Sequence, residues 1–527
     1  MVVPFLRGRT LRSVVQKNES VRLLIPGELG PESLQQEWHV VSHPQQSKVL
    51  QFWDSFEWGI WFGGHTLYSC DDVYHLCSRD DGWLGSELCE ERARGKRRFW
   101  HDFESAPMRT GLEEMLGQRA LLPVAEATFH LHRYEVTNEA GKIVCRLEWT
   151  SVTLGERVVL RSCLVIPLRG YAAEAAHVAE QLTARGAQIS SDCPLAQLLQ
   201  HGNKVPQKYT LRPSCGLNAD TPAREAVGRI VRSILEIAVH NIPGILQDLD
   251  TEYLHDYRIC LRKIRSLLSL VKDVFPAAET RRIRTVLGDI ARNTNRLRDL
   301  DVYLLARDEY LGLLAPELRQ HLEGMFEDFS AEREIEVKRT TAQMRAHPAS
   351  QRFRKIEGYF SEETRHKAAP ASDLPVGPLV FQGIYKRYRK IRKIADGVGA
   401  ETPDEVIHQI RIECKKLRYL MEFFDELIPR EDGDALLKLL RKLQGRLGDF
   451  NDASVQRKSL WHYWQQKKAS SDAALGVGGL IAILYHRQQQ TRGLIEQELA
   501  AFCGKLTAAT FKRTFKLRAD ASETTAP

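Results

Sequence analysis

The sequence predicts two domains, an α+β domain over residues 1–185 and an all-α domain over residues 222–517. The first region alternates short runs of β-branched and aromatic residues with turn signals, as half-buried strands do. The second region has the apolar spacing of long amphipathic helices and few strand signals. A length of 527 residues also exceeds what one domain ordinarily uses. Residues 186–221, which have little periodicity, are predicted to be a linker, and residues 518–527 a disordered tail.

The α+β domain is predicted to be mostly antiparallel. A β-hairpin is expected where two strand-like runs flank Asn-Glu-Ala-Gly, and a helix where Ala and Glu become frequent after the last strand. The expected elements are the strands Val21–Ile25, Phe129–Val136, Lys142–Thr150 and Val158–Pro167, a glycine-rich aromatic run among the strands at Gly59–Gly64, and the helix Tyr171–Ala184.

Composition and charge indicate the cellular compartment in which the protein is expected. The net charge is +7, and its uneven placement along the chain is more informative than its size. The ten cysteines are scattered without a Cys-x-x-Cys pair, as expected for free thiols in a reducing cytoplasm. The basic N-terminus lacks the uninterrupted apolar segment of a signal peptide, and the longest apolar window is too short to span a bilayer. We therefore expect a cytoplasmic protein without membrane spans.

The helical domain contains one pattern twice, H-x-x-R-x-x-x-[RK]-K-[IL]-R-x-L, starting at His255 and at His408. Its histidine and spaced cations, at offsets 0, 3, 7 and 10, share one face of an α-helix, and apolar residues occupy the opposite face. No acid stands at these positions, so an anionic ligand is the simplest counter-charge. The residues of the pattern that are predicted to bind it are His255, Arg258, Arg262, Lys263 and Arg265 in the first copy and His408, Arg411, Lys415, Lys416 and Arg418 in the second.

The repeat extends beyond these helices. Pro276 and Pro429 end the two copies and are separated by the same 153 positions as the two histidines. A second basic helix follows in each copy, and an acid-free basic run precedes the second copy, so two tandem helical units are implied. The cations of these segments that are predicted to contact the anion are Arg284, Arg292, Arg296, Lys442 and Arg446, with Lys386, Arg389, Lys390 and Lys393 in the acid-free run.

These segments resemble the CHAD family, the histidine-containing α-helical domain. The resemblance covers roughly residues 220–515 and rests on both copies of the pattern and on the phrases Arg298-Asp-Leu-Asp-Val302 and Cys414–Phe424. It implies a bundle of two pseudo-symmetric four-helix repeats, at residues 222–330 and 379–517. It also implies a basic face that binds inorganic polyphosphate, and a location on polyphosphate granules.

The N-terminal domain resembles the CYTH or triphosphate-tunnel family, which implies an antiparallel, tunnel-like β-barrel. The resemblance rests on Phe52–Phe62, Arg146-Leu-Glu148 and Pro167–Tyr171. The family's metal-binding signature, E-x-E-x-K, is degenerate here, since at most one of its two glutamates survives, near Glu19. Two carboxylates that point inward from one strand would hold a divalent cation beside a triphosphate. The domain is therefore predicted to be non-catalytic.

Two alternatives to a polyphosphate-binding protein stay open. The first is a metal-dependent triphosphatase or adenylate cyclase-like enzyme in the N-terminal domain, with a divalent cation as cofactor. The second is a nucleic-acid-binding helical protein, which is disfavoured because outside Tyr385 and Tyr388 the basic stripes lack aromatic residues for base stacking. The carboxylates available to replace the lost metal ligand, none of them singled out by spacing, are Glu87, Glu90, Glu91 and Glu148.

Two weaker patterns receive structural interpretations. The histidine pairs have spacings that metals can use, but no third ligand is evident, so no metal site is predicted. These pairs are His39 with His43 and His130 with His132. Asp299 and Asp301 follow arginines closely and are expected to orient them through ion pairs. The sequence thus predicts a non-catalytic polyphosphate-binding protein without a cofactor, whose oligomeric state and protein partners it leaves open.

Overall fold

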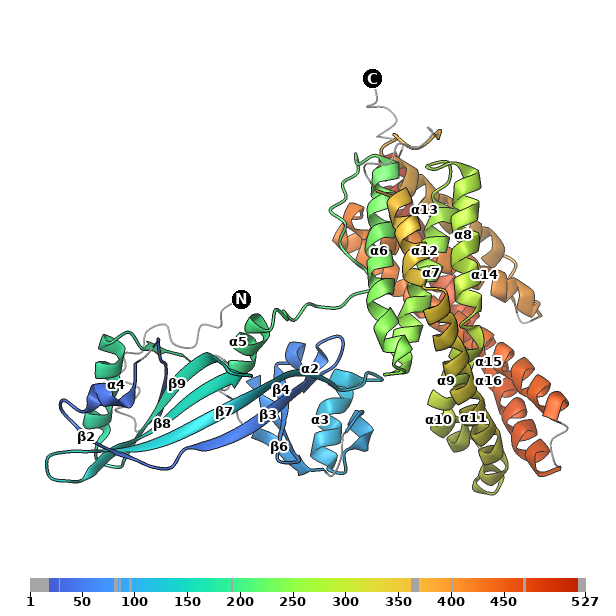
Figure 1. Cartoon of the computed structure of the whole chain (residues 1–527). Coiled ribbons are helices and arrows are strands. Elements are labelled where there is room, and N and C mark those ends of the chain that lie inside the picture. The colour runs from blue at the N-terminus through green and yellow to red at the C-terminus, as the bar shows by residue number, and fades with distance from the viewer. Residues whose placement is uncertain are drawn as a thin grey trace. The chain divides into compact units, whose positions relative to one another are not determined.

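The computed structural model describes residues 19–27, 29–79, 84, 87–93, 97–190, 193–361, 369–399, 401–467 and 471–519. The chain forms two compact units, Met1–Tyr209 and Thr210–Pro527 (Figure 1). The first unit is built on a β-sheet with a few helices, and the second on helices. The predicted order, an α+β domain followed by an all-α domain, is confirmed.

The first unit contains one antiparallel sheet. Its strands are β1 (Val21–Leu24), β2 (His39–Ser42), β3 (Gln46–Asp54), β4 (His65–Cys70), β5 (Val73–Ser78), β6 (Glu87–Arg92), β7 (Leu122–Thr137), β8 (Ile143–Leu154), β9 (Arg157–Pro167) and β10 (Gln188–Ile189). They lie in the order β10-β1-β9-β8-β7-β3-β4-β5-β6, with β2 also paired to β7, and the predicted hairpin is β7 with β8. Within the described residues β10 pairs only with β1 and β6 only with β5, so the sheet is open and a closed barrel is not shown.

Alternating side chains of the long strands build apolar cores on both faces of the sheet. On one face, Cys163 and Val165 of β9 pack with α4 (Ala172–Ala184), the helix expected at this place. On the other face, Leu160 of the same strand belongs to a core that includes α5 (Pro194–His201). A third core joins β3, β4 and β5 to α3 (Ala106–Leu116).

The glycine-rich run Gly59–Gly64, expected among the strands, instead contains the helical turn α2 (Gly59–Phe62). The carboxylate of Asp54 starts this turn, because it accepts hydrogen bonds from the backbone N–H groups of Ile60 at 3.0 Å and Trp61 at 2.9 Å. Asp54 is buried, and burial raises the pKa of its carboxyl to about 6 in spite of these bonds. A strand would leave the buried carboxylate without these donors.

The segment 186–221, expected to be a linker, is partly structured. It contains β10, which pairs with β1, and α5, whose Leu195, Leu198 and Leu199 are buried in the core of the sheet. Packing of this segment extends the first compact unit to Tyr209.

The second unit consists of two successive runs of helices. The first run is α6 (Ala223–Leu246), α7 (Thr251–Leu270), α8 (Ala277–Arg292), α9 (Asn295–Leu305), α10 (Arg307–Leu313), α11 (Pro316–Ala346) and α12 (Ala349–Tyr359). The second run is α13 (Val376–Ala395), α14 (Asp404–Phe423), α15 (Arg430–Lys467), α16 (Ser471–Cys503), α17 (Lys505–Phe511) and the π-helical turn Lys512–Lys516. Helices α6 and α13, α7 and α14, and α8 and α15 begin 153 positions apart, which is the spacing of the two histidines.

The two runs are joined where each of them begins. Pro222 and Pro375, again 153 positions apart, form an isolated antiparallel bridge. The N–H of Ala223 donates to the carbonyl before Pro375, and the N–H of Val376 donates to the carbonyl before Pro222, both at 2.9 Å. Each of these hydrogen bonds is the equivalent of the other under the repeat, so a local two-fold axis passes between the two prolines.

A separate apolar core holds the remaining long helices together. It joins α9, α10 and α11 of the first run to α15 and α16 of the second, with Tyr303, Phe329, Leu460 and Leu480 among its buried residues. Within the part of the chain that the structure describes, no helix combines the length and apolarity needed to cross a membrane.

Candidate anion-binding surface

Helices α7 and α14, which carry the two copies of the histidine pattern, pack against each other. The apolar sides of both helices face the interior, where Tyr257, Leu261 and Ile264 of α7 are buried. Helix α7 begins at Asp250, whose carboxylate accepts hydrogen bonds from the N–H groups of Glu252 and Tyr253. Burial of the apolar stripe turns the basic stripe of each helix outward, as the pattern predicts.

The centre of the basic surface is formed by equivalent residues of the two repeats. Arg262 of α7 and Lys415 of α14 are 153 positions apart, and their charges lie close enough to repel each other. Burial, followed by the nearby charges of Arg411, Arg262 and Arg418, lowers the pKa of Lys415 to about 8, although Asp452 partly offsets this effect. The excess of positive charge around Lys415 disfavours the protonated form of its side chain, and a bound anion would relieve the repulsion.

From this centre the basic surface continues over α7 onto α8. Arg262 and Arg265 are exposed on α7, and the guanidinium of Arg265 lies over Gly288 of α8, where an added Cβ would be 3.4 Å from its Cζ. Arg284 is exposed one turn before Gly288. None of these three arginines is paired with a carboxylate among the residues that the structure describes.

Arg258 and Arg411, the equivalent arginines one turn nearer the histidines, have different partners. Arg258 donates to the carbonyl of Ala291 at 2.8 Å and to the hydroxyl of Thr294 at 2.7 Å, and burial lowers its pKa. These bonds tie α7 to the break between α8 and α9. Arg411 lies 3.7 Å from the carboxylate of Asp452. Arg258 thus stabilises the packing of α7 against this break, in addition to contributing positive charge.

The two histidines also lie in different surroundings. His408 is exposed, and its Nδ1 lies 2.7 Å from the side-chain oxygen of Asn451. It lines a cavity of about 290 Å³ that is also lined by Lys458 and by two acids of the first turn of α14. His255 is half-buried, and its ring lies beside Glu252 and Asp256, with one ligand atom of each within 4.8 Å of the others. Acids therefore lie near both histidines, and of the two only His408 is exposed.

Helix α13 adds a basic stripe of its own. Lys386, Arg389 and Lys393 are exposed and have no carboxylate partner within the described ranges. The neighbouring Lys390 instead lies 3.0 Å from the carboxylate of Glu413 on α14. The stripe predicted from the sequence is therefore present, with one of its four cations neutralised.

Glu413 collects three cations. It accepts hydrogen bonds from Arg387 at 2.6 Å, from Lys390 at 3.0 Å and from Lys416 at 2.9 Å. Burial raises the pKa of Glu413, but the hydrogen bonds from Lys416, Lys390 and Arg387 outweigh burial and lower it to about 2. This carboxylate is therefore ionised, and the charge of Lys416 is used inside the protein.

Several other cations of the predicted set are buried or paired. Lys263 is buried and donates to the backbone carbonyl of Leu211 at 2.7 Å, so it does not belong to the basic surface. The other cations of this group are exposed or half-buried and pair with acids from other turns or other helices. These acids offset part of the positive charge of the surface. These pairs are Arg292 with Asp289, Arg296 with Glu332, Arg418 with Glu422, Lys442 with Glu498 and Arg446 with Asp449.

The weaker sequence patterns have structural roles. His130 and His132 lie at 2.8 and 2.9 Å from the hydroxyls of Ser47 and Ser42. The buried Asp301 accepts a hydrogen bond at 2.7 Å from Arg333, an arginine outside the phrase in which Asp301 stands. Two groups of potential metal ligands lie within the described residues, one at His255 and one around His75 of the first unit.

Comparison with known proteins identifies the helical unit. Residues 229–461 match the model of the CHAD domain, so the chain contains a CHAD domain, as the sequence patterns predicted. Over 264 residues the chain is 27% identical to Uncharacterized protein MT2285 and to Uncharacterized protein Rv2226, from two strains of Mycobacterium tuberculosis. The matched region is 49% of this chain, and it spans about half, 48%, of the length of these relatives.

Two solved structures are similar to part of this chain. The crystal structure of the CHAD domain from the plant Ricinus communis aligns with 55% of this chain and 96% of that chain, at 23% identity and a TM-score of 0.47. PptA from Streptomyces chartreusis aligns with 53% of this chain and 99% of that chain, at 16% identity and a TM-score of 0.40.

Proposed function

We propose that the CHAD domain of this chain binds inorganic polyphosphate on the basic surface centred on Arg262 and Lys415, and that the chain acts without catalysis. The observation that carries the proposal is the meeting of these two equivalent cations at the contact of α7 with α14, together with the low pKa of Lys415. Within the described residues, exposed and unpaired cations continue from this centre along α7 and α8, and α13 carries a further stripe of them.

A linear polyanion fits this distribution better than a small anion does. Polyphosphate carries about one negative charge per phosphate, and each cation that it meets releases a condensed counterion, as in backbone binding of nucleic acids. Arginine donates to phosphate oxygens in bidentate fashion, while lysine acts as a mobile point charge. Many modest contacts along one chain raise the affinity with chain length. Long-chain polyphosphate is accordingly the expected ligand.

The test replaces four cations of the surface together. We expect the variant Arg262→Ala, Arg265→Ala, Arg284→Ala, Lys415→Ala to lose retention on a polyphosphate resin at a salt concentration that retains the native protein. Arg258 is left intact because it holds the break between α8 and α9. The matched control removes four exposed cations of the first unit, Lys48, Lys142, Arg157 and Arg169, and should remain bound. Equal retention of the two variants would refute the proposal.

Competition separates polyphosphate from nucleic acid. Bases of single strands are generally held by stacking on exposed aromatic side chains, and Tyr388 of α13 is buried. We therefore expect long-chain polyphosphate to displace the protein from RNA of equal charge at a fixed salt concentration. Stronger binding to RNA under these conditions would favour the nucleic-acid alternative. In cells, binding to polyphosphate would place the protein on polyphosphate granules, which a fluorescent fusion can test.

For the N-terminal unit we propose a degenerate CYTH-like domain without triphosphatase activity. Beside the surviving Glu19, β1 carries Arg22, which donates to the hydroxyl of Ser162 at 3.2 Å. Burial lowers the pKa of Arg22 to about 10, and the charge of Glu148 partly offsets this. A cation at this place opposes the binding of a divalent metal on β1. Turnover of triphosphate or ATP with Mg²⁺ or Mn²⁺ by the purified protein would contradict this proposal.

A further inference from the structure

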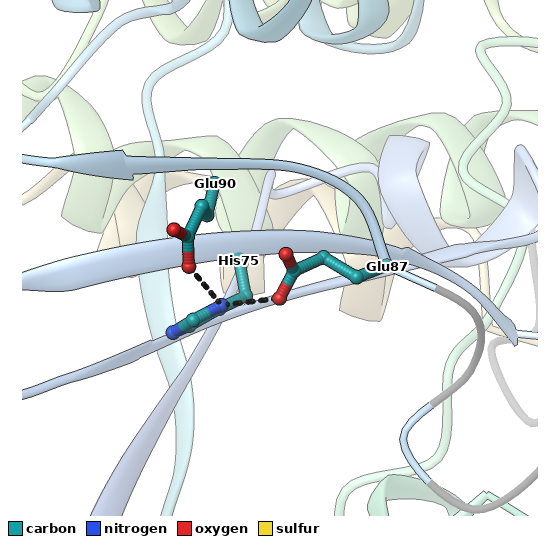
Figure 2. A group of neighbouring side chains, drawn as sticks. All are labelled: His75, Glu87 and Glu90. Carbon is teal, nitrogen blue, oxygen red and sulfur yellow. Dashed lines mark hydrogen bonds and ion pairs between the residues drawn. The ribbon is translucent and has the colours of Figure 1, made fainter.

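We propose that His75, Glu87 and Glu90 of the first unit form a binding site for a divalent transition-metal ion such as Zn²⁺ (Figure 2). The three side chains come from the paired strands β5 and β6, and Figure 2 shows the imidazole with both carboxylates directed toward it. One ligand atom of each residue lies within 4.8 Å of the other two. The site is separate from the basic surface of the helical unit and does not depend on its function.

A β-bulge brings the two glutamates to the same side of the strand. His75 is paired with Glu90, so these two side chains share one face of the sheet. In a regular strand Glu87 and Glu90, three positions apart, would point to opposite faces. The register shifts between Leu76 and Cys77, so that Cys77 is opposite Glu87 instead of Leu88. The shift turns Glu87 toward His75, which is a recurrent use of bulges at functional sites.

The imidazole is held in an orientation suited to ligation. Its ring stacks on Tyr68 of β4, with centroids 4.9 Å apart and an interplanar angle of 19°. Its Nδ1 is the atom that faces the carboxylates, at 2.8 Å from Glu87 and 3.6 Å from Glu90. A metal about 2.0 to 2.2 Å from each ligand would hold them roughly 3.0 to 3.5 Å apart. The observed spacing is close to this, and the exposed Glu90 side chain can make the small remaining adjustment.

The charges of the group call for a cation. The Nδ1 of His75 lies 2.8 Å from the carboxylate of Glu87 and 3.6 Å from that of Glu90. No lysine or arginine within the described ranges pairs with either carboxylate, so two carboxylates share a small volume. A divalent ion bound by Nδ1 and both carboxylates would balance their negative charge. Solvent would complete the coordination, since Glu87 and Glu90 are exposed by 46% and 61%.

The mixed ligand set also selects the class of ion. Imidazole suits Zn²⁺ and its neighbours in the first transition row, whereas Mg²⁺ and Ca²⁺ prefer oxygen ligands alone. We therefore expect Zn²⁺ to bind at least tenfold more tightly than Mg²⁺ or Ca²⁺. Equal affinity for Mg²⁺ would contradict the assignment of the imidazole as a ligand.

The experiment measures Zn²⁺ binding by the full-length protein. The protein is freed of metal with a chelator and dialysed against Zn²⁺ at micromolar concentration, and bound zinc is counted for the native chain and for Glu87→Gln and Glu90→Gln. Each variant should lose one equivalent of zinc, or bind it at least tenfold more weakly. Glutamine preserves the shape of each side chain, and an unchanged circular dichroism spectrum and melting temperature without metal would show that the variants fold.

Two controls locate the lost equivalent. Glu104→Gln removes an exposed carboxylate of the same unit, whose side chain is 89% exposed, and should keep the full zinc content. Glu252→Gln alters the other group of potential ligands and should leave the equivalent held by His75 unchanged. If Glu87→Gln and Glu90→Gln retain as much zinc as the native chain, His75 and the two glutamates form only a hydrogen-bonded cluster and the proposal is wrong.

Discussion

Replacing Lys415 with methionine should stabilise the free protein and weaken its binding of polyphosphate at the same time. In the free protein the lysine charge is opposed by burial and by Arg411, Arg262 and Arg418, as its low pKa shows. Methionine keeps most of the side-chain volume and removes the charge. Because the same charge is predicted to contact phosphate, the substitution should separate stability from function.

The magnitudes follow from the surroundings of Lys415. Like charges three or four positions apart on one helix, as Arg411 and Arg418 are from Lys415, destabilise by about 0.2–0.5 kcal/mol per pair. With a similar contribution from Arg262 of α7, the three cations account for about 1 kcal/mol. For a unit of this size, that corresponds to a melting temperature higher by about 2 °C. A hydrogen bond to a charged group contributes about 1.5–3 kcal/mol, so its loss should weaken polyphosphate binding roughly 10- to 100-fold. The slope of log K against log salt should become shallower by about 0.7–0.9.

The assay combines thermal unfolding with polyphosphate titrations at several salt concentrations. Lys48→Met serves as the control, because Lys48 is exposed on β3 in the other unit. This control should change neither the affinity nor the salt slope. A Lys415→Met variant that is less stable than the native protein and binds polyphosphate equally well would refute the cationic centre as the binding site.

Two further predictions concern Lys415 and Lys263. The pKa of Lys415 is lowered from the ordinary 10.5 to about 8 in the folded protein, so its side chain is charged below pH 8. Because the unfolded protein then binds more protons than the folded one between pH 8 and 10.5, the stability of the free protein rises over this range. The affinity for polyphosphate should fall as the pH rises through about 8. Calorimetry in buffers of different ionisation heat should detect up to one proton taken up by the protein on binding near pH 8.5. An affinity that does not depend on pH, or equal proton uptake by Lys415→Met, would argue against protonation of Lys415 on binding. Lys263→Met should change polyphosphate affinity less than twofold, because Lys263 is buried against the carbonyl of Leu211. A loss of affinity as large as that of Lys415→Met would show that Lys263 belongs to the binding surface.

Helical periodicity predicted the long helices and the outward direction of their basic stripes well. The offsets of the cations in the two copies of the pattern determine which of them share a face, and tertiary packing only has to cover the opposite, apolar side. The repeat spacing likewise predicted the equivalence of α7 and α14. It did not predict that Arg262 and Lys415 would meet, because the packing of two helices is not encoded in either one alone.

The sequence did not predict which cations are paired with acids from distant positions. Glu413 stands inside the second copy of the pattern, but the two cations that reach it from α13 come from more than twenty positions earlier. The local pattern places Lys263 among the available cations, but in the fold its side chain is buried and donates to the carbonyl of Leu211. Such contacts depend on tertiary packing, so local periodicity overestimates the number of available charges.

The metal-binding group was missed for a similar reason. Glu87 and Glu90 were recognised as carboxylates, but a regular strand would have separated them on opposite faces. The bulge that turns Glu87 is a local irregularity without a glycine or proline to mark it. The strand pairing that adds His75 is also a tertiary property, and it supplies the third ligand that spacing alone did not reveal.

The reciprocal hydrogen bonds at Pro222 and Pro375 have a consequence for the order of folding. This contact closes a loop of about 150 residues, and closures between distant segments form slowly compared with local helices. During synthesis the first run of helices leaves the ribosome well before α14 exists, so a nascent chain carries only half of the cationic centre. The complete centre arises when the second run docks, and a polyanion that binds only the docked form will favour that last step by mass action.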